Sequence, residues 1–126
     1  MDNNLKQIIK IQYDSLPDNI KMAILDADLP TKLQIIAKKH NLLLDQAGDL
    51  ETETTLVLLG LESITDFVSN IKTALNVPDF IANKIAIDVG NEIFQEIRES
   101  LQEMADRDEA ESISKESILN EIENPV

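Results

Sequence analysis

The apolar residues of this chain recur at helical spacing, and the longest uninterrupted run of that pattern covers residues 78–107. Aliphatic side chains follow one another there at a stride of four, with a last step of three: Ile81, Ile85, Val89, Ile93, Ile97, Leu101 and Met104. An α-helix turns once in 3.6 residues, so a stride of four drifts by roughly 40° per step. The pattern therefore predicts one long helix that either changes its neighbours along its length or bends.

Two further features mark this long helix. Gly90 lies near its middle, where a glycine costs about 1 kcal/mol relative to alanine. It indicates either the close approach of a neighbouring helix or a kink. The opposite face carries five acidic side chains, all within about 80° of one another on the helix: Asp88, Glu92, Glu96, Glu99 and Glu103. We treat this acidic face as a candidate surface for a protein partner.

Proline and glycine divide the chain before residue 78 into shorter helical segments. We expect helices over residues 3–13, 17–28, 30–40, 45–59 and 63–76, with Gly60 as a left-handed end and Ser63 as an N-terminal cap. The spacing places these residues inward: Ile20, Ile24, Leu25, Leu33, Ile36, Ala37, Ala47, Leu50, Thr54, Val57, Leu58, Leu61, Phe67, Ile71, Ala74 and Leu75. No alternating run predicts a strand. The expected fold is all-α: an irregular orthogonal bundle of five or six helices with a long last helix.

The helical pattern weakens after Arg107. We predict one helical domain over residues 1–106 and an acidic flexible tail over 107–126, where two basic and six acidic side chains give a net charge of −4. Within the tail, Ile118, Leu119 and Ile122 would share one face of a short helix at 115–123. This helix either docks on its own domain, on a second copy or on another protein, or it is a frayed end with chance apolar residues.

Composition excludes several kinds of site. The chain of 126 residues has no cysteine, so it forms neither disulfides nor thiolate metal sites, and its single histidine excludes a two-imidazole site. We expect His40 to have a surface or capping role at the end of its helix. Asp45, Asp49, Glu51 and Glu53 lack the spacing of a calcium loop and fit a solvated helix start better. No metal or cofactor is therefore expected.

The net charge of −13 is unevenly distributed. Residues 1–40 hold six Lys and five Asp, which gives +1, and the remaining residues hold five basic and nineteen acidic side chains, which gives −14. Such a charge repels nucleic acid and anionic membranes, and three Phe with one Tyr offer few platforms for base stacking. Without a long apolar run or a signal-peptide pattern, we expect a soluble, cytoplasmic protein.

Two resemblances bear on the fold and the function. The segments Leu58–Leu61, Asp66–Phe67, Glu92–Phe94, Ile97–Leu101 and Ser117–Glu123 resemble a family of small bacterial all-helical proteins with no established activity. This resemblance covers most of residues 17–124 and implies a fold rather than a function.

The second resemblance is local. Leu59-Gly60-Leu61-Glu62-Ser63-Ile64 is similar to the segment of acyl carrier proteins that accepts phosphopantetheine on serine, although that family favours Asp where this chain has Glu62. The similarity implies that Ser63 would hold the prosthetic arm. As an alternative, Ser63 and Asp66 have the spacing of a capping box, which gives the serine a structural role.

No combination of nucleophile, base and orienting group can be found in the sequence. We therefore expect a non-enzymatic interaction module or adaptor that binds a protein, either a basic partner or a second copy of the chain. Binding would use the acidic face or a groove, with the tail as a docking peptide. The alternative is a carrier protein modified on Ser63.

Overall fold

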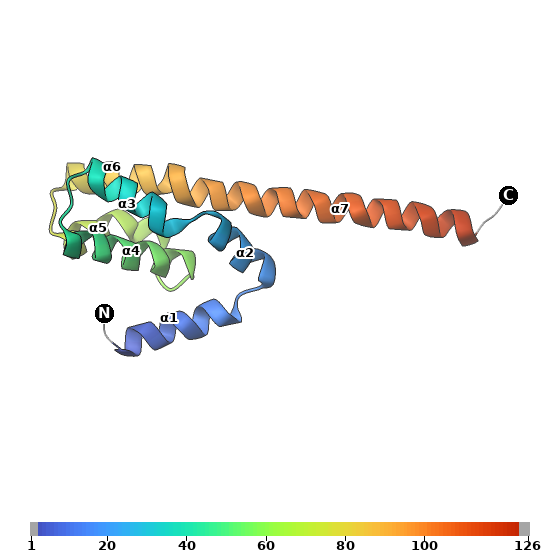
Figure 1. The fold of residues 1–126 in the computed structure, drawn as a ribbon, viewed down its shortest axis with the longest axis horizontal. Helices are drawn as coiled ribbons and strands as arrows, with labels where there is room; N and C mark the ends of the chain where they lie inside the picture. Colours follow the sequence, from blue (N-terminus) through green and yellow to red (C-terminus); the bar gives the residue numbers. More distant parts are fainter. Residues whose placement is uncertain (1–2, 124–126) are drawn as a thin grey trace.

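Helices make up nearly all of the computed structural model, which describes the backbone of residues 3–123 and the side chains of residues 3–110. Figure 1 shows their arrangement, and their bounds are as follows: α1 (Asn3–Ser15), α2 (Asp18–Asp26), α3 (Leu29–Lys39), α4 (Leu44–Leu58), the short 3₁₀ helix η1 (Ile64–Asp66), α5 (Phe67–Leu75), α6 (Asp79–Val89), the π-helical turn η2 (Gly90–Phe94) and α7 (Gln95–Glu123). Residues 3–123 contain no strand. The predicted all-α bundle with a long last helix is confirmed.

The predicted long helix is built from α6, η2 and α7, which continue one another as a single rod (Figure 1). A π turn takes one more residue than an α turn. It therefore compensates part of the drift that a stride of four produces in a regular α-helix. As a result Ile85, Val89 and Ile93 are fully buried, and Ile97 is only 6% exposed. The local underwinding keeps the aliphatic line on one face of the rod.

Gly90 begins the π turn, with ordinary right-handed backbone angles of φ −59° and ψ −46°. A side-chain carbon added there would meet no atom within 4 Å, so no neighbouring helix makes a close approach. Of the two expected roles, only a local irregularity of the helix fits. Alanine can adopt the same backbone angles and would fit the same space, so the turn does not require a glycine at this position.

Replacing Gly90 by alanine tests whether the π turn needs a glycine. Gly90→Ala is expected to raise the free energy of unfolding by up to about 1 kcal/mol, because the site is open and alanine favours the helix. Gly48→Ala, at an equally open position in α4, is the matched control for chemical denaturation. A loss of stability in Gly90→Ala beside a gain in Gly48→Ala would mean that the π turn needs glycine.

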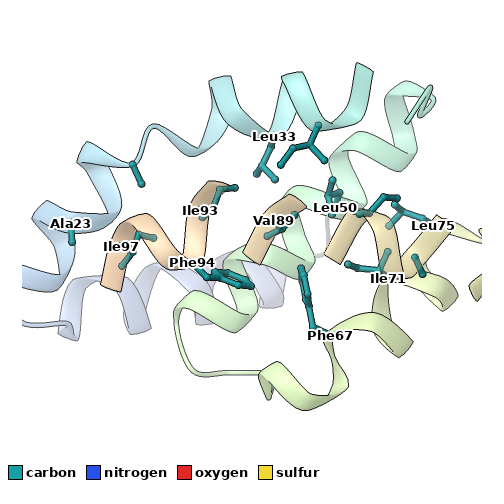
Figure 2. Packing of buried hydrophobic residues seen from close by; sticks show 14 residues of the cluster. Ala23, Leu33, Leu50, Phe67, Ile71, Leu75, Val89, Ile93, Phe94 and Ile97 are labelled. Carbon is teal, nitrogen blue, oxygen red and sulfur yellow. The ribbon is translucent and has the colours of Figure 1, made fainter. Parts of the chain in front are cut away.

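The core lies between the rod and the shorter helices, and Figure 2 shows its central residues. α5 packs against both α4 and α6, α3 packs against α4 and α6, and α2 packs against α7. Phe67 of α5 meets Phe94 of the π turn edge to face, with ring centroids 5.4 Å apart. The predicted inward residues of α3, Leu33, Ile36 and Ala37, are all buried.

Some predicted inward positions are wrong. Leu25 is 69% exposed, because α2 turns Ala23 and Ala27 toward the core instead. Ala74 is exposed, while its neighbour Leu75 is buried. Leu61 is 39% exposed, although Gly60 does have the predicted left-handed conformation, with φ 74°. Leu25 is exposed because α2 presents a different face to the core, whereas Leu61 lies in the loop after α4.

The C-terminal segment continues the last helix. The backbone is helical without a break from Gln95 to Glu123, so no linker separates residues 107–114 from the helix before them. Residues 107–114 lack an apolar face and therefore predict no packing against the domain. A helix can still form there, because residues 107–123 contain no Gly or Pro and many strong helix formers. α7 runs well beyond the bundle (Figure 1). The division into a domain over residues 1–106 and a flexible tail over residues 107–126 stays a prediction.

Candidate interaction surfaces

The acidic face of the rod is partly covered by α3. Asp88 accepts a hydrogen bond from Nζ of Lys39 at 3.1 Å, and its other oxygen lies 2.6 Å from Nε2 of His40. Further along, Glu96 forms an ion pair with Lys32. These contacts hold α3 against the rod. Two members of the predicted acidic face are therefore structural partners of α3.

The sequence predicts a surface or capping role for His40, but its side chain is largely buried. Its side chain is only 8% exposed and follows the last residue of α3. Burial alone would raise the pKa of Asp88, but hydrogen bonds from His40 and Lys39 outweigh it and hold that pKa below its ordinary value of 3.8. The Asp88 carboxylate is thus kept ionised beside two donors.

The other members of the acidic face remain accessible. Glu92, Glu99 and Glu103 are exposed, and Glu99 accepts a hydrogen bond from Gln95 one turn earlier. Isolated carboxylates on a solvated helix contribute little to recognition by themselves. This reduces the acidic face to a row of three separated charges.

A groove lies between α1 and α4, two helices that are distant in sequence. It has a volume of about 670 Å³ and two chemically different walls. α1 lines it with the half-buried aliphatic side chains of Leu5 and Ile9, together with Lys6. α4 lines it with polar and acidic residues: Asp45, Gly48, Asp49, Glu51, Thr52 and Thr55. The first carboxylates of α4, predicted as a solvated helix start, therefore form one wall of a groove.

The α1 wall lies at the edge of the bundle. No residue of α1 is buried, and the aliphatic side chains of Ile8 and Ile11 are 50% and 69% exposed. A hydrogen bond from Nε2 of Gln12 to the carbonyl oxygen of Leu59, 2.9 Å long, ties the helix to the end of α4. Helices with so little buried surface open at low free-energy cost. The groove can therefore widen by movement of α1.

Ser63 caps the helical segment that follows it. Its Oγ accepts a hydrogen bond from the backbone N–H of Thr65 at 3.2 Å and lies 2.8 Å from the Thr65 hydroxyl. Ser63 is exposed and precedes η1, while α5 itself begins only at Phe67. The capping role is therefore observed, and its N–H partner is that of Thr65. Attachment of phosphopantetheine to Ser63 stays a prediction.

The predicted docking residues Ile118, Leu119 and Ile122 lie outside the part of the chain whose side chains are described. Their backbone belongs to the far end of α7, which is directed away from the bundle (Figure 1). Among the described residues, no group of three or more His, Cys, Asp or Glu side chains is arranged to hold a metal ion. Within the same part of the chain, no helix is long and apolar enough to cross a membrane.

Comparison with known proteins adds no relative. No family model, no curated protein and no solved structure matches this chain. The resemblance to small bacterial helical proteins therefore stays an expectation.

Proposed function

We propose that this protein is a non-enzymatic interaction module that binds an amphipathic helix of a basic protein partner in the groove between α1 and α4. The observation that carries this proposal is the contrast between the two walls of the groove. One wall offers Leu5 and Ile9, and the other offers Asp45, Asp49 and Glu51. A ligand that satisfies both walls needs an apolar side and a cationic side.

A helix is the simplest peptide structure with two such sides. Residues three and four apart share a face of a helix, so leucines and lysines at that spacing separate into an apolar and a basic stripe. An amphipathic helix laid into the groove would bury its apolar stripe against α1 and direct its basic stripe to α4. Gly48 widens the groove, since nothing lies within 4 Å of the place where its side chain would be.

The charge of the chain favours a foreign partner over a second copy. Because each copy has a net charge of −13, two copies repel each other once they approach to within the Debye length of about 8–10 Å. The same charge attracts a basic segment and accelerates its association. A second copy of the chain is therefore the less favourable partner.

A model peptide tests the groove. The probe is a labelled helix of about four turns with leucine and lysine at amphipathic spacing, and the control peptide carries glutamate in place of lysine. We expect the lysine peptide to bind and the glutamate peptide not to bind in fluorescence anisotropy. Gly48→Met should weaken binding at least about tenfold, or 1.4 kcal/mol, because the new side chain fills the groove.

Two controls separate groove binding from general attraction. Gly48→Ala adds only a methyl group at the same place and should bind almost as the wild type does. Asp45→Asn with Asp49→Asn should weaken binding more than Glu99→Gln with Glu103→Gln, which removes the same charge from the rod. Equal effects of the two charge pairs, or full binding by Gly48→Met, would rule out the groove.

The carrier alternative is supported by the exposure of Ser63 at the start of a helical segment. An attached phosphodiester would keep the serine oxygen as an acceptor for the N–H of Thr65. The intact mass of the protein purified from its native cell decides between the two functions. A phosphopantetheine adduct that disappears in Ser63→Ala would replace the interaction proposal by a carrier function.

A further inference from the structure

A carboxyl group of α4 is placed where an ionised carboxylate is unfavourable. Oε2 of Glu53 is shielded from solvent, and no donor group of the described residues hydrogen-bonds to it. The N–H of Glu62 donates to the carbonyl oxygen of Leu56, one turn after Glu53 on α4, which brings the Glu62 carboxyl group next to that of Glu53. Two ionised carboxylates are both acceptors, so they cannot bond to each other. A single proton between them would satisfy the buried oxygen.

The remaining surroundings favour that proton. The charged groups that act on Glu53 are Glu62, from the loop after α4, and Asp49, one turn earlier on α4 itself. Both are acidic, and both therefore oppose a second negative charge. Asn70 of α5 donates a hydrogen bond from Nδ2 to Oε2 of Glu62 at 3.0 Å, which fixes the position of the Glu62 carboxyl group. The amide of Asn70 thus positions Glu62 but carries no positive charge that would neutralise the pair.

We propose that Glu53 and Glu62 share one proton in the folded protein, and that this proton fastens the loop after α4 to the helix itself. The loop reverses direction at Gly60, with the N–H groups of Leu61 and Glu62 donating to the carbonyl oxygen of Leu56 at 2.9 and 3.1 Å. Glu62 therefore returns toward the last turns of α4, where Glu53 receives it. Through Asn70 the same contact extends to α5.

The shared proton makes the fold sensitive to pH near neutrality. Burial and the Glu62 carboxyl group raise the pKa of Glu53 from 4.5 to about 7. Below pH 4.5 the folded and unfolded chains both hold the proton, and the stabilisation is complete. Between pH 4.5 and about 7 the unfolded chain loses the proton while the folded chain keeps it, so stability falls as the pH rises. Above about pH 7 this stabilisation is lost.

Glu53→Gln tests the proposal, because its amide donates to Glu62 at every pH. We expect the wild type to lose stability relative to Glu53→Gln as the pH rises from 5 to 8 in chemical denaturation. Glu51→Gln removes the same charge from an exposed position of α4, and its stability difference from the wild type should not change over that range. If both variants follow the same pH dependence, no proton is shared.

A titration of the wild-type protein keeps the proposal testable even if Glu53→Gln fails to fold. Carbon-13 NMR of the glutamate carboxyl carbons should show one titration near pH 7. Glu62→Gln should move that titration to lower pH, because the hydrogen bond and the charge of Glu62 are lost while the burial of Glu53 remains. If every glutamate of the wild type titrates at ordinary acidic pH, the shared proton does not exist.

Discussion

Ile93→Ala is expected to lower the free energy of unfolding by about 2–5 kcal/mol, the range observed when a buried aliphatic side chain is truncated. Ile93 is fully buried and lies in the π turn, between the helices that meet the rod. The truncation removes contacts with several elements at once. A small domain has a total stability of 5–15 kcal/mol, so this one change would remove a large part of it.

Ile87→Ala is the matched control for this measurement. Ile87 occupies the same rod but is 61% exposed, so its truncation should stay within about 0.5 kcal/mol of the wild type. Glu96 would be a poorer control, since its replacement leaves Lys32 without its partner. Urea denaturation measures both variants. Equal losses in Ile93→Ala and Ile87→Ala would mean that the rod presents a different face to the bundle.

Phe67→Ala is expected to cost about 3–5 kcal/mol. Phe67 is 2% exposed and is the first residue of α5, where it meets Phe94 at an interplanar angle of 62°. This edge-to-face pair connects α5 to the π turn. Loss of the ring would leave a cavity at the point where two helices and the turn converge.

A double-mutant cycle separates the ring contact from simple burial. Phe67→Leu, Phe94→Leu and the variant that combines them should give a coupling free energy of about 0.5–1.5 kcal/mol, as aromatic pairs do. Leucine keeps the positions apolar, so that the folded state survives in every arm of the cycle. Strictly additive losses would show that the two rings fill space without interacting.

The sequence predicts best where one helix face meets one set of neighbours. Leu33, Ile36, Phe67, Ile71 and Leu75 are buried as their spacing indicates. Local patterns do not fix the exact rotation of a short helix: Ile24 of α2 packs against the core as predicted, but Ala23 and Ala27 are buried where Leu25 is exposed. The π turn was visible only indirectly, as a stride of four that a regular helix cannot keep on one face. The bend or drift expected from that stride is relieved by the turn itself.

The candidate sites were less predictable, because each depends on elements that are distant in sequence. The groove combines Leu5 and Ile9 with carboxylates some 40 residues later, and no spacing rule connects α1 to α4. Contacts of His40 with Asp88 and of Glu53 with Glu62 likewise require the folded arrangement. Only Ser63 could be assigned a capping role from its local sequence, because a helix cap is a local structure.

The rod changes how the size of this protein should be measured. α7 alone has 29 residues, or roughly 43 Å of helix, whereas a compact chain of this length has a radius of gyration of about 14 Å. A protruding rod increases the friction of the molecule in water without adding mass. The monomer should therefore elute early in gel filtration, in the range of a larger globular protein. Only a measurement of mass, by light scattering or sedimentation equilibrium, can distinguish such a monomer from a dimer.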